Sequence, residues 1–115
     1  MKTIDEIIRD TTPVLQKYRV VSAYLFESYA RGEADEESNV DIAALYSDHF
    51  DLIKEAGLEL DLQAALNMDV DLVSFRAETN ERFRNRVLHD MIHIYGMEFD
   101  ESQKQLLFKY PYLPY

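Results

Sequence analysis

The segment from Leu25 to Ala43 constrains the fold of this chain more than any other part, because it joins two apolar runs through a polar turn. The first run, Val20 to Phe26, is β-branched, aromatic and apolar on both faces, which is typical of a strand buried in the middle of a sheet. The second run, Val40 to Tyr46, resumes as a strand. The segment between them is polar and contains Gly32, so it predicts a turn with a short helical piece.

Two helix-start signals precede the first strand. Thr3 and Glu6 have the spacing of a capping box, which predicts a short helix from about Ile4 to Arg9. Thr12-Pro13 is typical of an N-cap followed by proline at the first helical position, so a second helical piece is predicted over Val14 to Tyr18. The N-terminal segment is therefore expected to hold two short helices.

The rest of the chain alternates helix and strand signals. Ile53, Ala56, Leu60 and Ala64 follow helical spacing and mark an apolar face on the longest helix, which Asn67 can end in a left-handed turn. The order of elements is helix and strand in alternation, which predicts an α/β fold with one small mixed β-sheet and helices packed against it. The remaining predicted elements are a strand from Asp69 to Phe75, a helix from Thr79 or Asn80 to about His89, a strand from Ile92 to Tyr95 and a helix from Asp100 to Phe108.

Length and composition limit the class of protein. With 115 residues, 47% of them hydrophobic, the chain is long enough for one core, and we expect a single domain over residues 1–115. A net charge of −10 repels a nucleic-acid backbone, so direct nucleic-acid binding is not expected. No apolar run is long enough for a membrane span or a secretory leader, which predicts a cytoplasmic protein without a membrane partner. Because the chain has no cysteine, any metal would be held by carboxylates, histidines or phosphate oxygens.

Acidic and amide side chains gather at the starts of two predicted strands. By alternation, Asn39 and Asp41 share one face of the second strand, and Asp69 and Asp71 share one face of the third. If these strands neighbour the first, the carboxylates converge beside the turn that follows Phe26. Such a cluster suits magnesium, which is usually bound through one or two carboxylates together with substrate phosphates. In an acidic protein, however, solvated carboxylates at strand ends are the more common explanation of these residues taken alone.

Three segments together resemble a known family. The pattern is a small-residue turn with serine, alanine and glycine, then a serine followed by two acidic or amide positions, and later an aspartate on a strand. It closely resembles the signature of the MNT-type minimal nucleotidyltransferases of the DNA polymerase beta superfamily. The matching residues are Leu25-Phe26-Glu27-Ser28-Tyr29-Ala30-Arg31-Gly32, Ser38-Asn39-Val40-Asp41-Ile42-Ala43 and Val70-Asp71-Leu72-Val73.

The resemblance implies roles for individual residues. Ser28 would contact the triphosphate of ATP, Asp41 would hold magnesium, and Asp71 would be the third carboxylate and the candidate base. Gly32 matches the turn pattern, and Arg31 would either neutralise phosphate or brace the turn through a salt bridge. Asp69 has no counterpart in the family pattern, and we interpret it as a solvated carboxylate at a strand end.

Two positions depart from the family pattern. Asn39 stands where the family has its first metal-binding aspartate, so the negative charge that favours a hard cation is lost. Glu27 stands where the family has a glycine that lets backbone N–H groups approach phosphate closely. A carboxylate there adds bulk and like charge against a triphosphate. Both departures predict weakened magnesium and ATP binding, unless Glu27 itself supplies the carboxylate that Asn39 lacks.

The family resemblance leads to two hypotheses of function. Members of the family typically act as antitoxins of HEPN-domain ribonuclease toxins, and some transfer AMP from ATP to a toxin tyrosine. The first hypothesis is a hetero-oligomeric complex in which this chain neutralises a HEPN toxin mainly by contact, with a degenerate transferase site. The second is an active, magnesium-dependent protein adenylyltransferase. Whether the chain is an enzyme therefore depends on Glu27 and Asn39.

Overall fold

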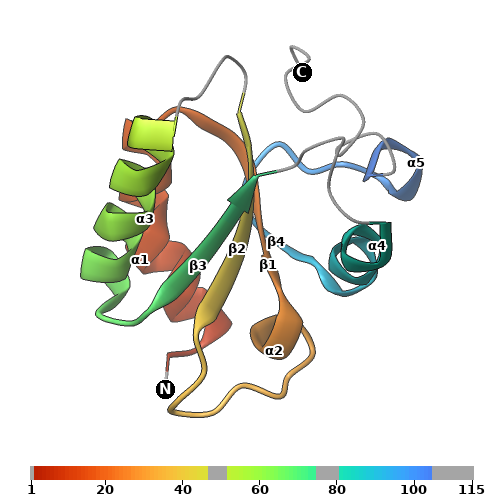
Figure 1. The fold of residues 1–115 in the computed structure, drawn as a ribbon, viewed down its shortest axis with the longest axis horizontal. Helices are drawn as coiled ribbons and strands as arrows, with labels where there is room; N and C mark the ends of the chain where they lie inside the picture. The colour runs from red at the N-terminus through yellow and green to blue at the C-terminus, as the bar shows by residue number, and fades with distance from the viewer. Residues whose placement is uncertain (1, 47–51, 75–80, 105–115) are drawn as a thin grey trace.

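The computed structural model describes residues 2–46, 52–74 and 81–104, and it confirms the α/β fold with one mixed sheet (Figure 1). The four strands are arranged in the order β3-β2-β1-β4. β1 is antiparallel to both β2 and β4, whereas β2 and β3 are parallel. The elements are α1 (Ile4–Lys17), β1 (Val20–Phe26), α2 (Glu27–Ala30), β2 (Val40–Tyr46), α3 (Leu52–Leu66), β3 (Val70–Ser74), α4 (Glu81–Asp90), β4 (Ile92–Gly96) and α5 (Glu101–Lys104).

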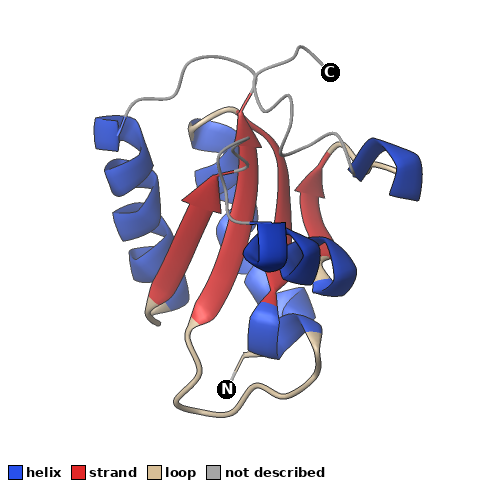
Figure 2. Cartoon of the chain, turned by 45° about the vertical axis from the view of Figure 1, so that its right-hand side comes forward, coloured by secondary structure: helices blue, strands red, loops and turns tan. Residues whose placement is uncertain are grey.

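The central strands are apolar on both faces because each face of the sheet carries a helical layer (Figure 2). On one face, Ala23 and Leu25 of β1 belong to the larger cluster of buried side chains, which includes those of α1 and α3. On the other face, Tyr24 and Phe26 join Met91 in a smaller cluster against which α4 packs through Leu88. This two-sided burial is the reason that β1 shows no alternation of polar and apolar residues.

The prediction of two helices before β1 was wrong, because α1 is one continuous helix that contains Pro13. Proline removes one backbone N–H from the helix interior. The adjoining turns are instead tied by hydroxyl groups: Thr11 Oγ1 donates to the Ile7 carbonyl at 2.7 Å and Thr12 Oγ1 donates to the Ile8 carbonyl at 2.6 Å. Since Thr11 is also fully buried, packing against the sheet keeps the helix intact across the proline. The capping box of Thr3 and Glu6 is confirmed.

The longest helix does not bury the apolar face that its sequence pattern marks. The buried side chains of α3 are Leu58, Leu62 and Leu66. Ile53 and Leu60 are instead 84% and 63% exposed. Apolar residues occur all round this helix, so periodicity alone does not determine which face meets the sheet.

Hydrogen bonds to the edge of the sheet explain the orientation of α3. Gln63 Oε1 accepts from the backbone N–H of Val70 at 3.3 Å, and Glu59 Oε1 accepts from that of Leu72 at 3.1 Å. These two N–H groups belong to β3, which is an edge strand with no further strand beside it in the part of the chain that the structure describes. An edge left unpaired would be open to association with other strands. The polar side chains of α3 therefore occupy the edge and direct Leu58, Leu62 and Leu66 into the core.

The smaller predictions have different outcomes. Asn67 has the predicted left-handed backbone, with φ of 53°. The predicted start of α4 at Thr79 or Asn80 and the end of the last helix near Phe108 lie outside the described residues. Within the described part of the chain, no helix is both long enough and apolar enough to span a membrane.

Candidate functional site

The candidate site is built on the turn between β1 and α2. β1 ends in extended conformation at Phe26, and the next residue, Glu27, which is the first of α2, has a left-handed backbone with φ of 59°. A residue with a Cβ pays about 1 kcal/mol for that conformation, and glycine does not. The family's preference for glycine at this position therefore has a second reason besides close approach to phosphate. Gly32 at the other end of the turn also has a positive φ, of 71°.

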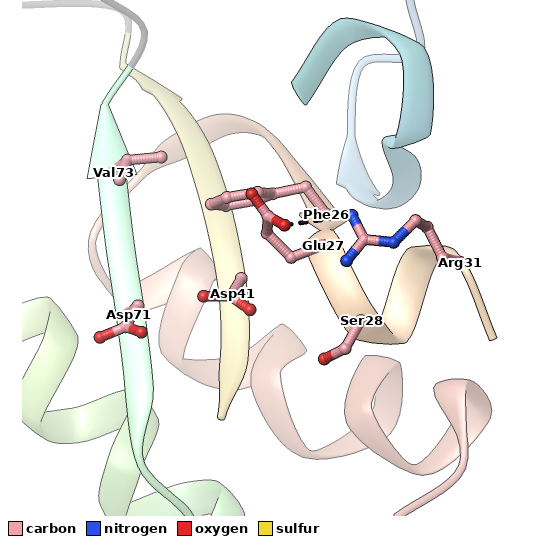
Figure 3. Close-up of a pocket in the computed structure, with 7 residues that line it drawn as sticks. All are labelled: Phe26, Glu27, Ser28, Arg31, Asp41, Asp71 and Val73. Carbon is pink, nitrogen blue, oxygen red and sulfur yellow. Dashed lines mark hydrogen bonds and ion pairs between the residues drawn. The ribbon is translucent and has the colours of Figure 1, made fainter. Parts of the chain in front are cut away.

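Two carboxylates face each other across the parallel strands at the start of β2 and β3. Asp41 and Asp71 are register partners, so their side chains emerge on the same face of the sheet. Both line the same pocket as Glu27 and Ser28 of the turn (Figure 3). The sequence-based expectation that Asp41 and Asp71 converge beside this turn is met by the geometry.

The environment of Asp41 favours its neutral form. Burial raises the pKa of the Asp41 carboxyl to about 6, and the charge of Asp71, a hydrogen bond with Asp71 and the charge of Glu27 act in the same direction. The nearby guanidinium of Arg31 opposes this rise. A carboxyl group whose pKa is raised by burial and like charges has a strong electrostatic preference for a cation, and such groups cluster at functional sites.

Asn39 contacts one of these two carboxylates. Its Nδ2 donates to Asp71 Oδ2 at 3.2 Å. The amide thus presents its N–H group, rather than its oxygen, to the carboxylate that a cation would bind. An N–H group supplies Asp71 with a partial positive charge and cannot be a metal ligand.

Arg31 is engaged by three carboxylates. Its guanidinium lies 3.1 Å from Glu27, 3.2 Å from Glu33 and 3.1 Å from Asp90. These contacts raise the pKa of Arg31, with the hydrogen bond to Glu27 as the largest cause. Of the two roles considered for Arg31, the one that the structure describes is a salt bridge that braces the turn. Its contact with Asp90 also joins α2 to the C-terminal end of α4.

These side chains surround an open pocket of about 480 Å³. Five of the seven candidate residues line it, whereas Gly32 lies in the turn and Asn39 reaches the site through Asp71. Phe26 and Val73 form apolar walls that motif reasoning missed. It also missed Asp90. A carboxylate at the C-terminal end of a helix is electrostatically unfavourable, so its presence there is a signal that a cationic partner lies nearby. The pocket is lined by Phe26, Glu27, Ser28, Arg31, Asp41, Asp71 and Val73 (Figure 3).

The donor set of the pocket can be compared with the needs of magnesium. Among the described residues, no three histidine, aspartate or glutamate side chains gather closely enough to hold a metal ion. Asp41 and Asp71 nevertheless fit one Mg²⁺ that arrives with nucleotide phosphates, because such ions commonly take only one or two carboxylates from the protein. The carboxylate of Glu27 is paired with Arg31 at 3.1 Å.

Comparisons with known proteins agree with this geometry. The family model of polymerase beta nucleotidyltransferases matches residues 9–100. The candidate protein adenylyltransferase MJ1217 of Methanocaldococcus jannaschii is 37% identical over 98 residues, covering 82% of this chain and 100% of that protein. The protein adenylyltransferase MntA of Thermococcus cleftensis is 32% identical over 98 residues, covering 82% and 98%.

A solved structure gives the same result at the level of the fold and the sequence. A chain from a crystal structure of a toxin–antitoxin complex with AMP-PNP superposes with a TM-score of 0.70 and 26% identity. The superposition covers 94% of this chain and 82% of that one. The four-stranded mixed sheet, the turn after β1 and the family match over most of the sequence lead to one conclusion: the chain belongs to the polymerase beta nucleotidyltransferase family.

Proposed function

We propose that this chain is the antitoxin of a HEPN ribonuclease toxin and that it neutralises the toxin mainly by contact, in a hetero-oligomeric complex. The family supports this role, because similar proteins are named protein adenylyltransferase MntA and similar solved chains come from MntA–HepT toxin–antitoxin complexes. The proposal that contact dominates over catalysis rests on the side chains of the pocket.

The hydrogen bond from Asn39 to Asp71 is the observation that carries the proposal. A nucleotidyl-transfer site needs its strand-end carboxylates free to bind a cation, and two cations so held can stabilise the attacking and leaving oxygens. Here the amide of Asn39 donates to Asp71 at 3.2 Å. Asp71 is therefore hydrogen-bonded to a neutral side chain, and the site lacks the negative charge that an aspartate at position 39 would supply. Both effects weaken cation binding.

Glu27 weakens the site further on its phosphate side. Its carboxylate lies 3.1 Å from Arg31 within the pocket. It therefore occupies the place beside the guanidinium where a phosphate oxygen could otherwise bind. A bound triphosphate would meet the like charge of Glu27. At about 4 Å such repulsion is worth roughly 1 kcal/mol in water and several times more in a partly dry cleft. Weakened ATP binding is the expected result.

The alternative is an active adenylyltransferase that moves AMP from ATP to a toxin tyrosine. The intact pair of Asp41 and Asp71, the pKa of about 6 at Asp41 and the open pocket beside Ser28 favour it. Mg²⁺ would be held by Asp41 and Asp71, and when bound it would supply positive charge to the phosphates. In that case Ser28 would contact the triphosphate, and Asp71 would be placed to accept the proton of the attacking hydroxyl.

Inhibition of the ribonuclease activity of a cognate HEPN toxin by a pocket variant distinguishes neutralisation by contact from adenylyl transfer. The double variant Asp41→Asn with Asp71→Asn removes both carboxylates, and Asp69→Asn is the matched control because Asp69 precedes β3 outside the pocket. If contact neutralises the toxin, both variants will inhibit its ribonuclease activity as well as the parent chain does, in the absence of ATP. Inhibition by the parent chain that requires added ATP and magnesium, and that the double variant alone lacks, would favour the enzyme.

A labelling experiment tests the degeneracy of the pocket directly. The parent chain is incubated with its toxin, magnesium and ATP labelled in the α-phosphate. Label on a toxin tyrosine would contradict the proposal that the chain acts by contact alone. The variant Asn39→Asp with Glu27→Gly restores the family pattern, and we expect it to raise incorporation of label. Unchanged incorporation would contradict the view that these two residues impair the site.

A further inference from the structure

Helix α3 carries a second apolar face, opposite to the one that packs in the core. Ile53 and Leu60 lie two turns apart on the outer side of the helix and are 84% and 63% exposed. Ala56 and Ala64 extend the same side and are also exposed. We call these four residues, Ile53, Ala56, Leu60 and Ala64, the outer stripe. Their spacing places them on one side of a helix with 3.6 residues per turn.

The outer stripe has no partner within the described part of the chain. Figure 1 shows α3 at the margin of the molecule, with α1 and β3 beside it and its outer side open. The stripe continues into a hollow of about 570 Å³ at the C-terminal end of the helix. This hollow is lined by Leu60, Gln63, Ala64, Asn67, Met68 and Asp69. The exposed apolar stripe could contact the apolar side chains of a partner, and the hollow beside it could accept one of them.

A surface helix normally has one apolar stripe and one polar face, and a helix that is apolar on two sides is typically covered on both. The inner face of α3 already meets the sheet through Leu58, Leu62 and Leu66. Exposed large apolar residues grouped on one face indicate an interaction site more often than isolated ones do. The outer stripe is therefore expected to have an occupant.

The charges beside the stripe define the chemistry of that occupant. Glu59 borders it on the side of β3, and the exposed Asp69 lies at its C-terminal end. On the side of α1, Asp61 is paired with Lys17 at 3.2 Å and the exposed Lys54 lies near the start of the helix, so the acidic charge that faces a partner comes mainly from Glu59 and Asp69. The chain as a whole carries a net charge of −10. We propose that the outer stripe binds an amphipathic helix of another protein, in which an apolar row is flanked by lysine and arginine residues. In this mode of binding, apolar side chains at helical spacing on the partner dock on the surface, and complementary charge selects the partner.

A second copy of this chain is the less favourable occupant. An isologous contact through the stripe would bring two chains of net charge −10 together and place acidic borders near one another. Long-range repulsion of this kind slows association and costs binding free energy. A basic helix instead gains from the same field.

The test uses a synthetic amphipathic peptide of about 18 residues, long enough to populate a helix, with leucines in a row flanked by lysines. A matched peptide replaces the lysines with glutamates. Binding is followed by fluorescence anisotropy with the parent chain and with two variants. Leu60→Glu places a charge in the stripe, and Ala65→Glu is the matched control, because Ala65 is an exposed residue of the same helix outside the stripe.

We expect the lysine peptide to bind the parent chain and Ala65→Glu alike, and Leu60→Glu to weaken binding by at least about tenfold through loss of the apolar anchor. Binding that Leu60→Glu leaves unchanged, or equal binding of the glutamate peptide, would overturn the proposal. So would light scattering that shows a dimer of the parent chain and a monomer of Leu60→Glu. Circular dichroism establishes that both variants are folded. No toxin takes part, so the result is independent of the proposed antitoxin function.

Discussion

Asp41 should make the folded protein less stable at neutral pH than at mildly acidic pH. Its carboxyl group is half-buried beside Asp71 and Glu27, and these surroundings raise its pKa to about 6 from an ordinary value of 3.8. The folded state therefore holds a proton that the unfolded chain releases between these two pH values. Because the folded state binds more protons there, the contribution of this group to stability is fully present below about pH 4 and is lost as pH rises through 6.

The magnitude follows from the same numbers. One pH unit of pKa difference corresponds to about 1.4 kcal/mol, so a rise of roughly two units amounts to about 3 kcal/mol at most. Part of the side chain faces the open pocket, and solvent screening there reduces the cost to about 1–2 kcal/mol. The variant Asp41→Asn removes the charge and nearly keeps the shape. It should be more stable than the parent by about that amount at pH 8, and by almost nothing at pH 4.

Urea denaturation at pH 8 and at pH 4 measures both differences, with the slope of the transition checked for two-state behaviour. Asp69→Asn, outside the pocket, is the control and should show no such gain at pH 8. Carbon-13 NMR of the Asp41 carboxyl gives its pKa directly. An Asp41→Asn variant that is no more stable than the parent at pH 8, or whose advantage is the same at pH 4, would refute the reasoning.

Three further outcomes are expected. Gly96→Ala should cost at least about 2 kcal/mol of unfolding free energy, because its Cβ would lie 2.0 Å from the Val21 carbonyl oxygen at a φ of 76°. Gly32→Ala, with a φ of 71° and open space around it, should cost only about 1 kcal/mol. Equal costs of the two variants in denaturant unfolding would argue against the clash. Glu59→Ala should cost about 1–2 kcal/mol and speed hydrogen exchange of the Leu72 amide, since that N–H loses its acceptor, while Glu59→Gln should preserve protection; an unchanged exchange rate would contradict the role of α3 at the sheet edge. Asn39→Asp should lower the melting temperature without metal, through repulsion with Asp71, and increase the shift caused by magnesium; a magnesium shift equal to that of the parent would show that Asn39 does not limit cation binding.

Local signals in the sequence predicted the strands and the turn well. β1 and β2 were predicted with the bounds that the structure has, because strands covered on both faces are continuous apolar runs of limited length. The pairing of Asp41 with Asp71 was predicted only conditionally, since alternation gives the face of a residue but not the neighbour of its strand. The order of the strands, β3-β2-β1-β4, came only from the structure.

Two predictions failed for the same physical reason. Pro13 signalled a helix start, yet α1 runs through it because Ile7, Thr11 and Leu15, on one side of the helix, are buried in the fold. The pattern of Ile53 and Leu60 marked the wrong side of α3, whose orientation depends on hydrogen bonds to β3. In both helices a contact distant in the sequence outweighed a local preference, which is a weak bias that tertiary packing routinely overrides.

The sequence by itself determined the family, the positions of the strands, the two aspartates of the pocket and the two residues that depart from the family pattern. Those features depend on residue type and on spacing within short segments. Only the tertiary structure decided that Asn39 donates to Asp71, that Arg31 is shared among three carboxylates, and which face of α3 remains open. These features depend on side chains that meet across different elements, and such meetings are set by the packing of the whole chain rather than by any one segment of it.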